Sequence, residues 1–560
     1  MKLSYREKKN DLVEDLLKRG FSKTLANILA SRKISSADDC CYDFNKLLAP
    51  NLLKDCIEAG NYLADALLSN KKIFIVGDYD ADGATATATA IKGLNLFGFK
   101  NVDFLIPSRF KSGYGLSPEI VDEVKRLDGN IIITVDNGIG SFQAIDRANT
   151  CGIDVIITDH HLQAEKLPNA KFIVNPNRID CNFPSKNLCG VGVVFYLLIS
   201  IRKALRDKNY FNQNKEANLL EVIDLVALGT IADLVPLDFN NRLIVNYGLK
   251  KIRSNQCNEG IKQLLILSNK NFTECKTTDL SFSVAPKINA AGRMNDMSIG
   301  VRCLISSSPS EVISISKSLM NLNYQRRETE HEMTANADDM LKGFNESNLS
   351  ICLYNSDWHQ GIVGILASRI KEKFKRPTII FSEDDDGYLK GSGRSISSIH
   401  LRDVIDKIYK KNSNNFLSFG GHAMAAGVKI KKDFFIEFSQ NFEIEVSKLI
   451  DHEDLDEIVN LDESLLDENL TFDLVKEINE YSWGQDFPAP IFRDSFDVIE
   501  QNIVAEKHLK LILRNGKQEF EGIYFNRSEG LPDKIKAVYS LNNQIFRNKQ
   551  TIQVVIKAHE

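Results

Sequence analysis

Short apolar runs that alternate with helix-length amphipathic segments are the feature that most restricts how this chain folds. They begin after Lys72, and the runs are Ile73 to Val76, Val102 to Ile106, Ile131 to Val135, Val155 to Ile157 and Phe172 to Val174. Strands that are buried on both faces have continuous apolar sequences, and intervening helices allow neighbouring strands to run parallel. The pattern predicts an α/β fold with a doubly wound parallel sheet.

The next part of the chain predicts a long helix and a second α/β unit. Ser310 to Leu341 contains neither Pro nor Gly, which favours a long connecting helix. Beyond it we expect a helix around Ile362 to Phe374, a strand at Thr378 to Phe381 and a glycine-rich turn at Phe419 to Gly427. Residues 1–70 have apolar positions at helical spacing and predict helices.

The C-terminal tail has the pattern of a small β-barrel. Strand-like runs at Leu509 to Leu513, Phe520 to Tyr524 and Thr551 to Ile556 accompany a turn at Asn515-Gly516. This tail also carries a basic strand and turn, which would follow a phosphate backbone or simply be solvated. Its cations are Lys507, Lys510, Arg514 and Lys517.

The 560 residues accommodate several domains, and the patterns divide the chain into successive segments. We expect a helical segment, the first α/β domain, a connecting helix, the second α/β domain, an acidic linker and the barrel. Their predicted limits are 1–45, 46–309, 310–345, 346–450, 451–490 and 491–560.

The net charge of −5 does not exclude a polyanionic partner, because it is unevenly distributed. Residues 451–480 alone sum to −11, so the remainder of the chain is +6. The charged N-terminus has no secretory signal, and the longest apolar stretch, Val191 to Ile201, is too short to span a bilayer. We therefore expect a cytoplasmic protein without a membrane role.

Three carboxylates follow the first predicted strand at alternate positions. Asp78, Asp80 and Asp82 precede Gly83 and a run of small residues. Alternate residues of an extended segment point the same way, and ligands of open α/β sheets bind at the carboxyl ends of strands. Because converging negative charges need a cation, a metal site is the simplest interpretation, with a solvated acidic loop or a calcium loop as the alternative.

Further candidate ligands follow later elements of the same domain. Asp136 follows the strand that ends at Val135, Asp159-His160-His161 follow the strand that ends at Ile157, and Asp233 follows a helical stretch. Each position is weak evidence alone, but their recurrence at successive strand ends is strong. Oxygen-rich sites with one or two imidazoles suit Mn²⁺ or Mg²⁺.

At this point the chain resembles the DHH phosphoesterase superfamily and, within it, the RecJ family. The resemblance rests first on DYDADG at 78–83 and DHH at 159–161. The other matching motifs are IPSR at 106–109, GYG at 113–115, ALGTIAD at 227–233, NAAGRM at 289–294, WHQGIVG at 358–364, GSGRS at 391–395 and GGHAMAAG at 420–427. So many motifs in order make the resemblance specific.

The resemblance implies a fold and an activity. It implies a DHH domain, the connecting helix, a DHHA1 domain and a C-terminal OB-type barrel. The implied activity is exonuclease digestion of single-stranded DNA in the 5′→3′ direction, which releases 5′-mononucleotides during DNA recombination and repair. It further implies single-stranded-DNA-binding protein and a RecQ-type helicase as partners, a monomer, and association with the nucleoid.

The resemblance also implies a centre with two Mn²⁺ or Mg²⁺ ions. By analogy Asp136 bridges them, Asp82, His160 and Asp233 bind one ion, and Asp78 and Asp80 bind the other. Asp136, His160 and His161 are the residues that it implies for catalysis. His161 would face the scissile phosphate as a donor, or alternatively pack behind His160.

Within family motifs, Arg109, Arg293, Ser392 and Arg394 are the candidates for binding the 5′-terminal phosphate. Two further residues are candidates for contacts with the nucleic acid. His422 would contact its backbone or occupy a helix-start turn, and Tyr114 would stack on a base or lie in the core.

Two other functions compete with the exonuclease. One is a DHH-type phosphodiesterase of short oligonucleotides or cyclic dinucleotides, but such enzymes are shorter and lack the barrel. The other is a non-catalytic binding protein that has lost metal ligands, whereas every expected ligand is present here.

Overall fold

The computed structural model describes residues 2–109, 115–345, 347–450, 458–465, 470–546 and 549–560. They form two compact units. The smaller unit consists mainly of residues 290–296 and 318–458, and the larger unit of residues 3–289, 297–317 and 459–560.

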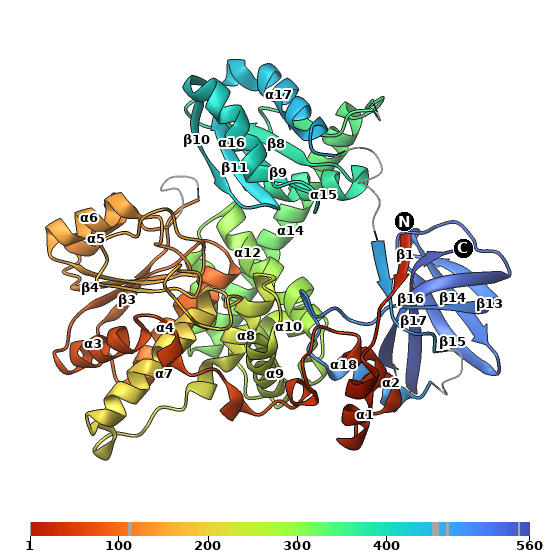
Figure 1. Cartoon of the computed structure of the whole chain (residues 1–560), viewed down its shortest axis with the longest axis horizontal. Coiled ribbons are helices and arrows are strands. Elements are labelled where there is room, and N and C mark those ends of the chain that lie inside the picture. Colours follow the sequence, from red (N-terminus) through yellow and green to blue (C-terminus); the bar gives the residue numbers. More distant parts are fainter. Residues whose placement is uncertain (1, 110–114, 346, 451–457, 466–469, 547–548) are drawn as a thin grey trace. The chain divides into compact units, whose positions relative to one another are not determined.

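A five-stranded parallel sheet forms the centre of the alternating region in the larger unit, as predicted (Figure 1). Its strands are β2 (Ile73–Val76), β3 (Val102–Leu105), β4 (Ile131–Val135), β5 (Asp154–Thr158) and β6 (Phe172–Val174). Their order is β3-β2-β4-β5-β6, and every neighbouring pair is parallel. The chain leaves β2 toward one side and later returns to the other, so β2 and β4 flank a switch point, where such sheets bind ligands.

Helices cover both faces of this sheet, so it is doubly wound, as predicted (Figure 1). On one face, α5 and α6 enclose a core that includes Phe74, Ile132 and Val155. On the other face α7 packs against both α3 and α4. These helices are α3 (Cys56–Leu68), α4 (Ala81–Phe97), α5 (Pro118–Arg126), α6 (Phe142–Cys151) and α7 (Gly190–Asp207).

A helical region follows the sheet. Its first helix, α8, packs against α4, α7 and α9, which fixes the position of Asp233 at its C-terminal end. A single π-helical turn, Leu280–Val284, precedes α12. The helices are α8 (Ile223–Ala232), α9 (Phe239–Arg253), α10 (Glu259–Leu267), α11 (Thr277–Asp279), α12 (Ala285–Met294) and α13 (Ser298–Ile305).

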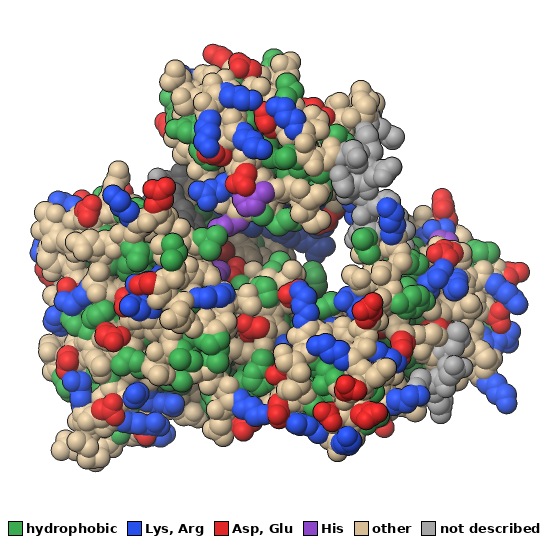
Figure 2. All heavy atoms as spheres, viewed as in Figure 1, with side chains coloured by type: hydrophobic (Ala, Val, Ile, Leu, Met, Phe, Trp, Pro, Cys, Tyr) green, Lys and Arg blue, Asp and Glu red, His purple; other side chains and the backbone are tan. Residues whose placement is uncertain are grey.

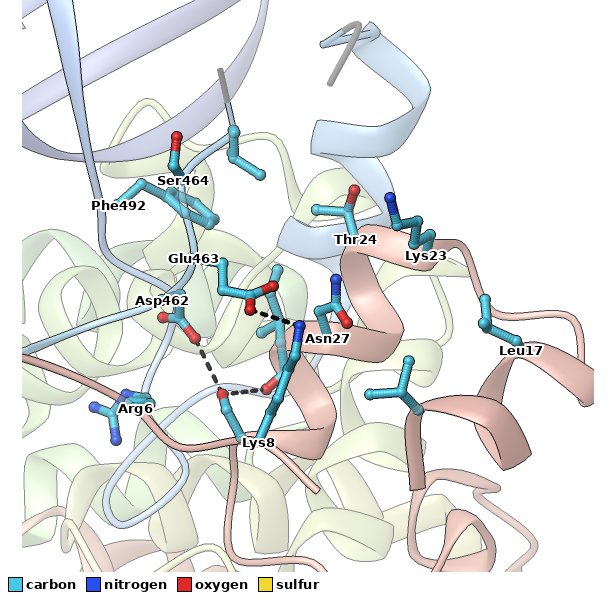
Figure 3. Close-up of a pocket in the computed structure, with 14 residues that line it drawn as sticks. Arg6, Lys8, Leu17, Lys23, Thr24, Asn27, Asp462, Glu463, Ser464 and Phe492 are labelled. Carbon is cyan, nitrogen blue, oxygen red and sulfur yellow. Dashed lines mark hydrogen bonds and ion pairs between the residues drawn. The ribbon is translucent and has the colours of Figure 1, made fainter. Parts of the chain in front are cut away.

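The N-terminal segment differs in part from the prediction of helices alone. It contains α1 (Asn10–Lys18) and α2 (Lys23–Ala30), but it begins with a strand, β1 (Lys2–Tyr5). This strand pairs with β12 (Ile458–Leu461), a partner at the far end of the chain that local sequence patterns do not reveal. A cavity of about 340 Å³ lies between α1, α2 and the segment that follows β12, lined by Arg6, Lys23, Asn27, Glu463 and Phe492 among others (Figure 3).

The tail forms a closed five-stranded barrel, as predicted. Its strands are β13 (Phe492–Val504), β14 (His508–Asn515), β15 (Gln518–Tyr524), β16 (Lys534–Phe546) and β17 (Lys549–His559), and α18 (Phe472–Glu480) packs against β16 and β17. Arg514 stands opposite Asp497 and Glu519 on the neighbouring strands and lies 3.7 Å from Asp497. The side chains of Arg514 and Asp497 therefore form an exposed ion pair across neighbouring strands.

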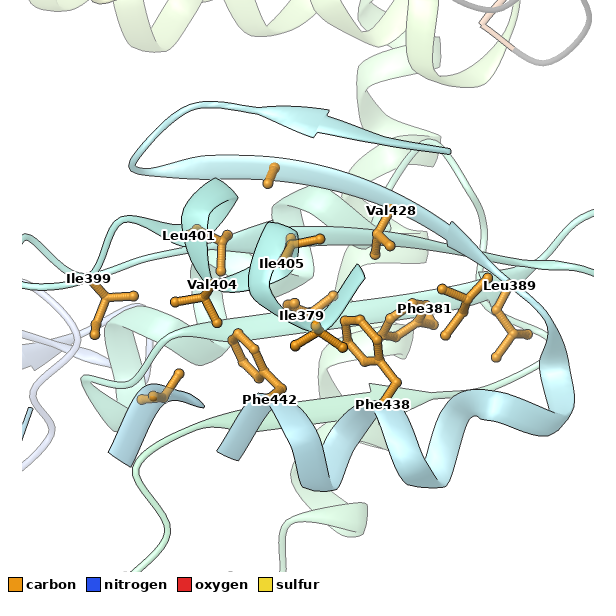
Figure 4. Packing of buried hydrophobic residues seen from close by; sticks show 14 of the residues in the cluster. Ile379, Phe381, Leu389, Ile399, Leu401, Val404, Ile405, Val428, Phe438 and Phe442 are labelled. Atoms are coloured by element: carbon orange, nitrogen blue, oxygen red, sulfur yellow. The ribbon is translucent and has the colours of Figure 1, made fainter. Parts of the chain in front are cut away.

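The smaller unit contains a second five-stranded sheet with the order β10-β11-β9-β8-β7, in which only β7 and β8 are parallel. Figure 4 shows α16 and α17 on one face, where Val404 and Phe438 pack with Ile379 and Phe381. On the other face α15 packs with the last turns of α14, the long helix that the sequence predicted. The elements are α14 (Pro309–Met340), β7 (Ile351–Tyr354), α15 (Val363–Phe374), β8 (Thr378–Glu383), β9 (Leu389–Arg394), α16 (Leu401–Asn412), β10 (Phe416–Gly421), β11 (Ala425–Ile430) and α17 (Phe435–Ser447).

The glycine-rich segment is a β-hairpin, so the prediction of one turn from Phe419 to Gly427 was wrong. Gly420 pairs with Gly427 across the two strands β10 and β11. Glycine is rare within strands, which is why its density indicated a turn. Tertiary pairing of Gly427 with Ser392 on β9 overrides that weak local preference.

The surface charges and the hydropathy of the helices can be followed on the folded chain. Basic and acidic side chains are interspersed over the face shown in Figure 2, without a broad region of one sign. None of the helices within the described ranges has both the length and the hydrophobicity required to cross a membrane.

Candidate metal centre and nucleic-acid site

Acidic and histidine side chains gather at the carboxyl edge of the parallel sheet. Their potential ligand atoms form three overlapping groups, in each of which the atoms lie within 4.8 Å of one another. The groups are Asp78 with Asp80 and Asp136, Asp82 with His160 and Asp233, and Asp136 with His160 and His161. We call Asp78, Asp80, Asp82, Asp136, His160 and Asp233 the acidic centre. It unites all the residues that the sequence nominated as metal ligands.

A tight turn from β2 into α4 positions the first two carboxylates. Asp80 is the N-cap of α4, and its Oδ1 accepts a hydrogen bond from the backbone N–H of Gly83 at 3.0 Å. A Cβ at Gly83 would lie 2.6 Å from the carbonyl oxygen of Asp78. Glycine is therefore required for the close approach that brings Asp78 and Asp80 together.

Asp82 is held by the start of α7. It is buried in the first turn of α4, and its carboxylate accepts hydrogen bonds from the backbone N–H groups of Gly190 at 2.6 Å and Val191 at 3.0 Å. A Cβ at Gly229 on α8 would lie 2.8 Å from Asp82 Oδ1. Small residues on two other helices thus allow this carboxylate to approach the sheet edge.

Asp136 adopts a left-handed backbone conformation with φ of 64°. Few residue types other than Gly adopt this conformation, although Asp and Asn do so more readily than most. The next residue, Asn137, stabilises it by donating hydrogen bonds to the carbonyl oxygens of Val76 at 3.1 Å and Val135 at 2.9 Å. These bonds join the ends of β2 and β4, so Asn137 orients Asp136 at the switch point.

Burial and mutual repulsion raise the pKa values of four carboxyl groups in the acidic centre. Burial and Asp233 raise the pKa of Asp82 to about 7, and burial and Asp80 raise the pKa of Asp233 to about 7. The pKa values of Asp78 and Asp136 are also raised, by burial and by the other carboxylates. Within the described chain, Oδ1 of Asp78 is buried without a hydrogen-bond partner. Divalent cations would satisfy these acceptors.

His160 places a ring nitrogen that could bind a metal ion at the same centre. Its Nε2 lies 3.1 Å from Asp136 Oδ1 and 3.6 Å from Asp233 Oδ2. Burial, with the neighbouring His161, lowers the pKa of His160, so a lone pair is available at neutral pH. Carboxylate oxygens together with a neutral imidazole fit Mn²⁺ or Mg²⁺.

His161 is oriented by a buried carboxylate. Oδ1 of Asp159 accepts a hydrogen bond from His161 Nδ1 at 2.7 Å, and Oδ2 accepts one from the backbone N–H of Ile139 at 2.9 Å. Burial alone would lower the pKa of His161, but the bond to Asp159 raises it to about 9. The rings of His160 and His161 lie 4.6 Å apart, so His161 both neighbours His160 and carries a proton.

One candidate phosphate ligand lies beside the acidic loop. The guanidinium carbon of Arg109 lies 3.9 Å from the centre of the Tyr79 ring, which stands between Asp78 and Asp80 in the sequence. This cation–π contact positions Arg109 next to the acidic centre. Tyr114 lies outside the described residues.

The other candidates for the 5′ phosphate gather in the smaller unit at the N-terminus of α15. Arg293 Nη1 donates to the carbonyl oxygen of Gly361 at 3.0 Å. A Cβ at Gly364 would lie 2.9 Å from Ser392 Oγ and 3.2 Å from Arg394 Nη2. The guanidinium groups and the helix N-terminus each carry positive charge, so together they favour a bound phosphate.

His422 lies in the connection between β10 and β11. Its backbone N–H donates to the carbonyl oxygen of Ala425 at 2.7 Å, and its side chain is exposed. The alternative of a helix-start turn was wrong, because the segment is a hairpin. The exposed imidazole remains a candidate for contact with a ligand.

Sequence reasoning did not assign three supporting residues. Asp159 and Asn137 each lie directly beside a nominated ligand, and Asn289 accepts a hydrogen bond from the backbone N–H of Ala81 at 2.8 Å. Asn289 opens the NAAGRM motif, and Asp159 opens DHH, so position within a motif was the available signal. Their roles depend on contacts between distant segments.

Comparison with known proteins agrees with this geometry. The DHH family N-terminal domain matches residues 72–230, the DHHA1 domain residues 348–448 and the RecJ OB domain residues 461–558. The chain is 42% identical over 547 residues to the single-stranded-DNA-specific exonuclease RecJ of Dickeya dadantii, covering 95% of both chains. It is 41% identical to the protein of that name from Escherichia coli, with the same coverage.

Solved structures extend the similarity to three dimensions. RecJ from Thermus thermophilus in complex with Mn²⁺ matches with a TM-score of 0.82 and 25% identity, over 100% of this chain and 80% of that chain. Exonuclease RecJ bound to manganese matches with a TM-score of 0.61 and 31% identity, over 72% of this chain and 97% of that chain. With an acidic centre, all three domains and relatives matched over nearly their whole length, the chain belongs to the RecJ family of single-stranded-DNA-specific exonucleases.

Proposed function

We propose that this chain is a metal-dependent exonuclease that hydrolyses single-stranded DNA from the 5′ end and releases 5′-mononucleotides. The overlap of the ligand groups at Asp136 and His160 is the observation that carries the proposal, because it suits two adjacent ions. Relatives of the same length are named single-stranded-DNA-specific exonucleases, and related structures contain Mn²⁺. Their similarity favours this activity over hydrolysis of short oligonucleotides or cyclic dinucleotides.

The residues of the acidic centre have distinct roles in this proposal. Asp136 would bridge two ions, with Asp82, His160 and Asp233 on one side and Asp78 and Asp80 on the other. When bound, the ions supply activation of water and stabilise charge on the phosphoryl group. Burial raises the pKa values of Asp78, Asp82, Asp136 and Asp233, so these carboxyl groups would release any bound protons when an ion binds.

His161 would hold the scissile phosphate. Asp159 keeps the imidazole oriented and protonated, with a pKa of about 9 for His161, so the ring can donate a hydrogen bond to a phosphoryl oxygen. Such a charge-assisted bond strengthens as negative charge develops in the transition state. His161 is thus proposed as a donor, and His160 as a ligand.

The 5′ end would be recognised by phosphate-binding side chains. Arg293, Ser392 and Arg394 at the N-terminus of α15 supply donors of the kind that bind a terminal phosphate at several oxygens. Arg109, in the larger unit, is a separate candidate for a phosphate contact beside the acidic centre. His422 and the barrel would contact the rest of the strand. Lys507, Lys510, Arg514 and Lys517 are the candidates of the barrel for phosphate contacts, and Arg514 also lies near Asp497.

The test uses single-stranded DNA with a block at either the 5′ or the 3′ end. The substrates are incubated with Mn²⁺ beside a blunt duplex, and Asp136→Ala serves as the inactive control. We expect degradation that only the 5′ block stops, that spares the duplex and that fails with Asp136→Ala. Hydrolysis of dinucleotides without degradation of long strands would replace the proposal with a small-substrate phosphodiesterase.

The wider setting is also a proposal. Family membership supports work in DNA recombination and repair, in the cytoplasm and at the nucleoid, as a monomer. A single-stranded-DNA-binding protein and a RecQ-type helicase would supply single strands to the enzyme. Co-sedimentation with each purified partner, with and without DNA, tests these associations, and sedimentation of the protein alone tests its oligomeric state.

A further inference from the structure

Two aliphatic side chains are exposed to water in the segments that follow β5 and β6. Leu162, which directly follows His161, is 62% exposed, and Ile179 is 83% exposed. The backbone N–H of Ile179 donates a hydrogen bond to Gln163 Oε1 at 3.0 Å, so neighbouring segments present the two side chains. Aliphatic side chains gain free energy when a ligand removes them from water.

The segment that carries Ile179 is hydrogen-bonded to the segment that carries the DHH motif at 159–161. Asn177 Nδ2 donates to the carbonyl oxygen of His160 at 2.6 Å, and Asn175 Nδ2 donates to that of His161 at 2.9 Å. Both bonds end on the two residues that precede Leu162. The position of Ile179 is therefore set by the same backbone that positions the two histidines.

The loop around Ile179 is also fixed from within the domain. Arg178 is buried and donates hydrogen bonds to both carboxylate oxygens of Asp180, at 2.8 and 2.9 Å. It also donates to Asp55 Oδ2 and to the carbonyl oxygen of Ile173, each at 2.6 Å. A loop held by several hydrogen bonds loses little conformational entropy when a ligand binds. Ile179 is thus held in water by a rigid support.

Sheet topology places both side chains at the ligand-binding edge. Leu162 follows β5 and Ile179 follows β6, two adjacent parallel strands. Their carboxyl ends lie at the edge that carries the acidic centre, where α/β sheets bind ligands. A molecule whose phosphate lies at His161 would place a neighbouring group over Leu162 and Ile179.

We propose that Leu162 and Ile179 form an apolar platform that contacts the base of a nucleotide close to the scissile phosphate. This inference rests on the proposed exonuclease function and adds positioning residues to it. A base in a single strand exposes its apolar faces, whereas a paired base in a duplex is stacked on its neighbours. The platform therefore favours unpaired DNA, and it accepts every base because all have an apolar face.

The experiment removes the platform from the protein and the base from the DNA. Leu162→Ser, Ile179→Ser and the double variant are compared with the unmodified protein on 5′-phosphorylated single strands. Each strand carries one abasic nucleotide, placed in turn at successive positions from the 5′ end. Affinity is measured by fluorescence anisotropy in EDTA, and kcat/KM is measured with Mn²⁺.

At one position of the abasic nucleotide, the effect of the missing base should depend on whether Leu162 and Ile179 are present. There, loss of the base should weaken binding and kcat/KM of the unmodified protein by about 10-fold, as for burial of one large aliphatic side chain. The double variant should lose about 10-fold on intact DNA and lose little more on the abasic strand. Equal responses of the double variant and the unmodified protein to an abasic nucleotide at every position would overturn the inference.

A matched exposed leucine controls for solubility and folding. Leu68, 58% exposed at the end of α3, is changed to Ser, and this variant should bind and cut like the unmodified protein. If Leu162→Ser lowers the melting temperature more than Leu68→Ser does, Leu162 packs within the protein and the platform is refuted. An unmodified protein that neither binds nor cuts single strands would instead refute the proposed exonuclease function.

Discussion

Asp159 accepts a hydrogen bond from Nδ1 of His161 at 2.7 Å, and this contact determines the charge of the histidine that borders the acidic centre. Burial lowers the pKa of His161, but Asp159, with further contributions from Asp233 and Asp78, raises it to about 9. The same carboxylate has its own pKa lowered to about 2, because the bonds from His161 outweigh the effect of burial. At neutral pH the two groups therefore form a buried ion pair.

Replacement of Asp159 by Asn should move the upper limit of the pH–activity profile. The pKa of His161 would fall to its ordinary value of about 6.5 or below, so the ring would be neutral at pH 7. We expect the kcat/KM of Asp159→Asn to fall above about pH 6.5, whereas that of the unmodified protein stays high to about pH 9. His161→Gln is the control, because this side chain does not titrate. Identical pH–activity profiles for Asp159→Asn and the unmodified protein would show that Asp159 does not influence catalysis through His161.

The metal-free protein should lose stability as pH rises. Asp82 and Asp233 have pKa values of about 7 when folded, against about 4 in an unfolded chain. Between these values the folded state binds more protons, so unfolding becomes easier as pH increases from about 4 to about 7. Thermal unfolding in EDTA across this range measures the effect, and a rising melting temperature would contradict it.

Metal binding should release protons for the same reason. Mn²⁺ displaces the protons that the buried carboxyl groups hold, so about one or two protons should appear per protein at slightly acidic pH. Calorimetry in two buffers with different ionisation enthalpies counts them. Asp233→Asn should release fewer protons and bind Mn²⁺ more weakly. An unchanged number of released protons would show that Asp233 does not lose a proton on metal binding.

A methyl group at Gly190 should disrupt the acidic centre. The Cβ of alanine would lie 2.7 Å from Asp136 Cγ and would push Asp136 from its position. We expect Gly190→Ala to lower stability by about 1–3 kcal/mol and to weaken Mn²⁺ binding. Gly140 has open space at the same position and is the matched control. Equal Mn²⁺ affinities for Gly190→Ala and Gly140→Ala would show that the added methyl group at position 190 does not displace Asp136.

Loss of Arg394 should affect the choice of DNA end more than the chemical step. Its guanidinium lies at the N-terminus of α15 in the smaller unit, and it is not one of the candidate metal ligands. Arg394→Ala should reduce the preference for 5′-phosphate over 5′-hydroxyl ends by about 10-fold or more, as for loss of a charge-assisted hydrogen bond. Competition between the two substrates measures the preference, with the exposed Arg402→Ala as control. Equal loss of activity on both ends would refute the assignment.

The sequence determined most of the fold because its local signals agree with one another. The Val and Ile run at Ile131–Val135 predicted β4 at those bounds, since a strand buried on both faces must be apolar throughout. The stretch without Pro or Gly likewise predicted α14 to within a residue at each end. The candidate metal ligands were also accessible, because Asp136 directly follows β4, His160 lies two residues after β5, and parallel strands end at a common edge.

Tertiary structure decided the features that depend on distant partners. β1 exists because β12 pairs with it, and Gly420 lies in a strand because Gly427 stands opposite. Asp159, the partner of His161, is held by the backbone N–H of Ile139 on another segment, and the restraint of Ile179 depends on bonds from Asn175 and Asn177 to His161 and His160. Local sequence encodes backbone preference and side-chain chemistry. Strand pairing, burial and pKa arise only when segments far apart in the chain exclude water between them.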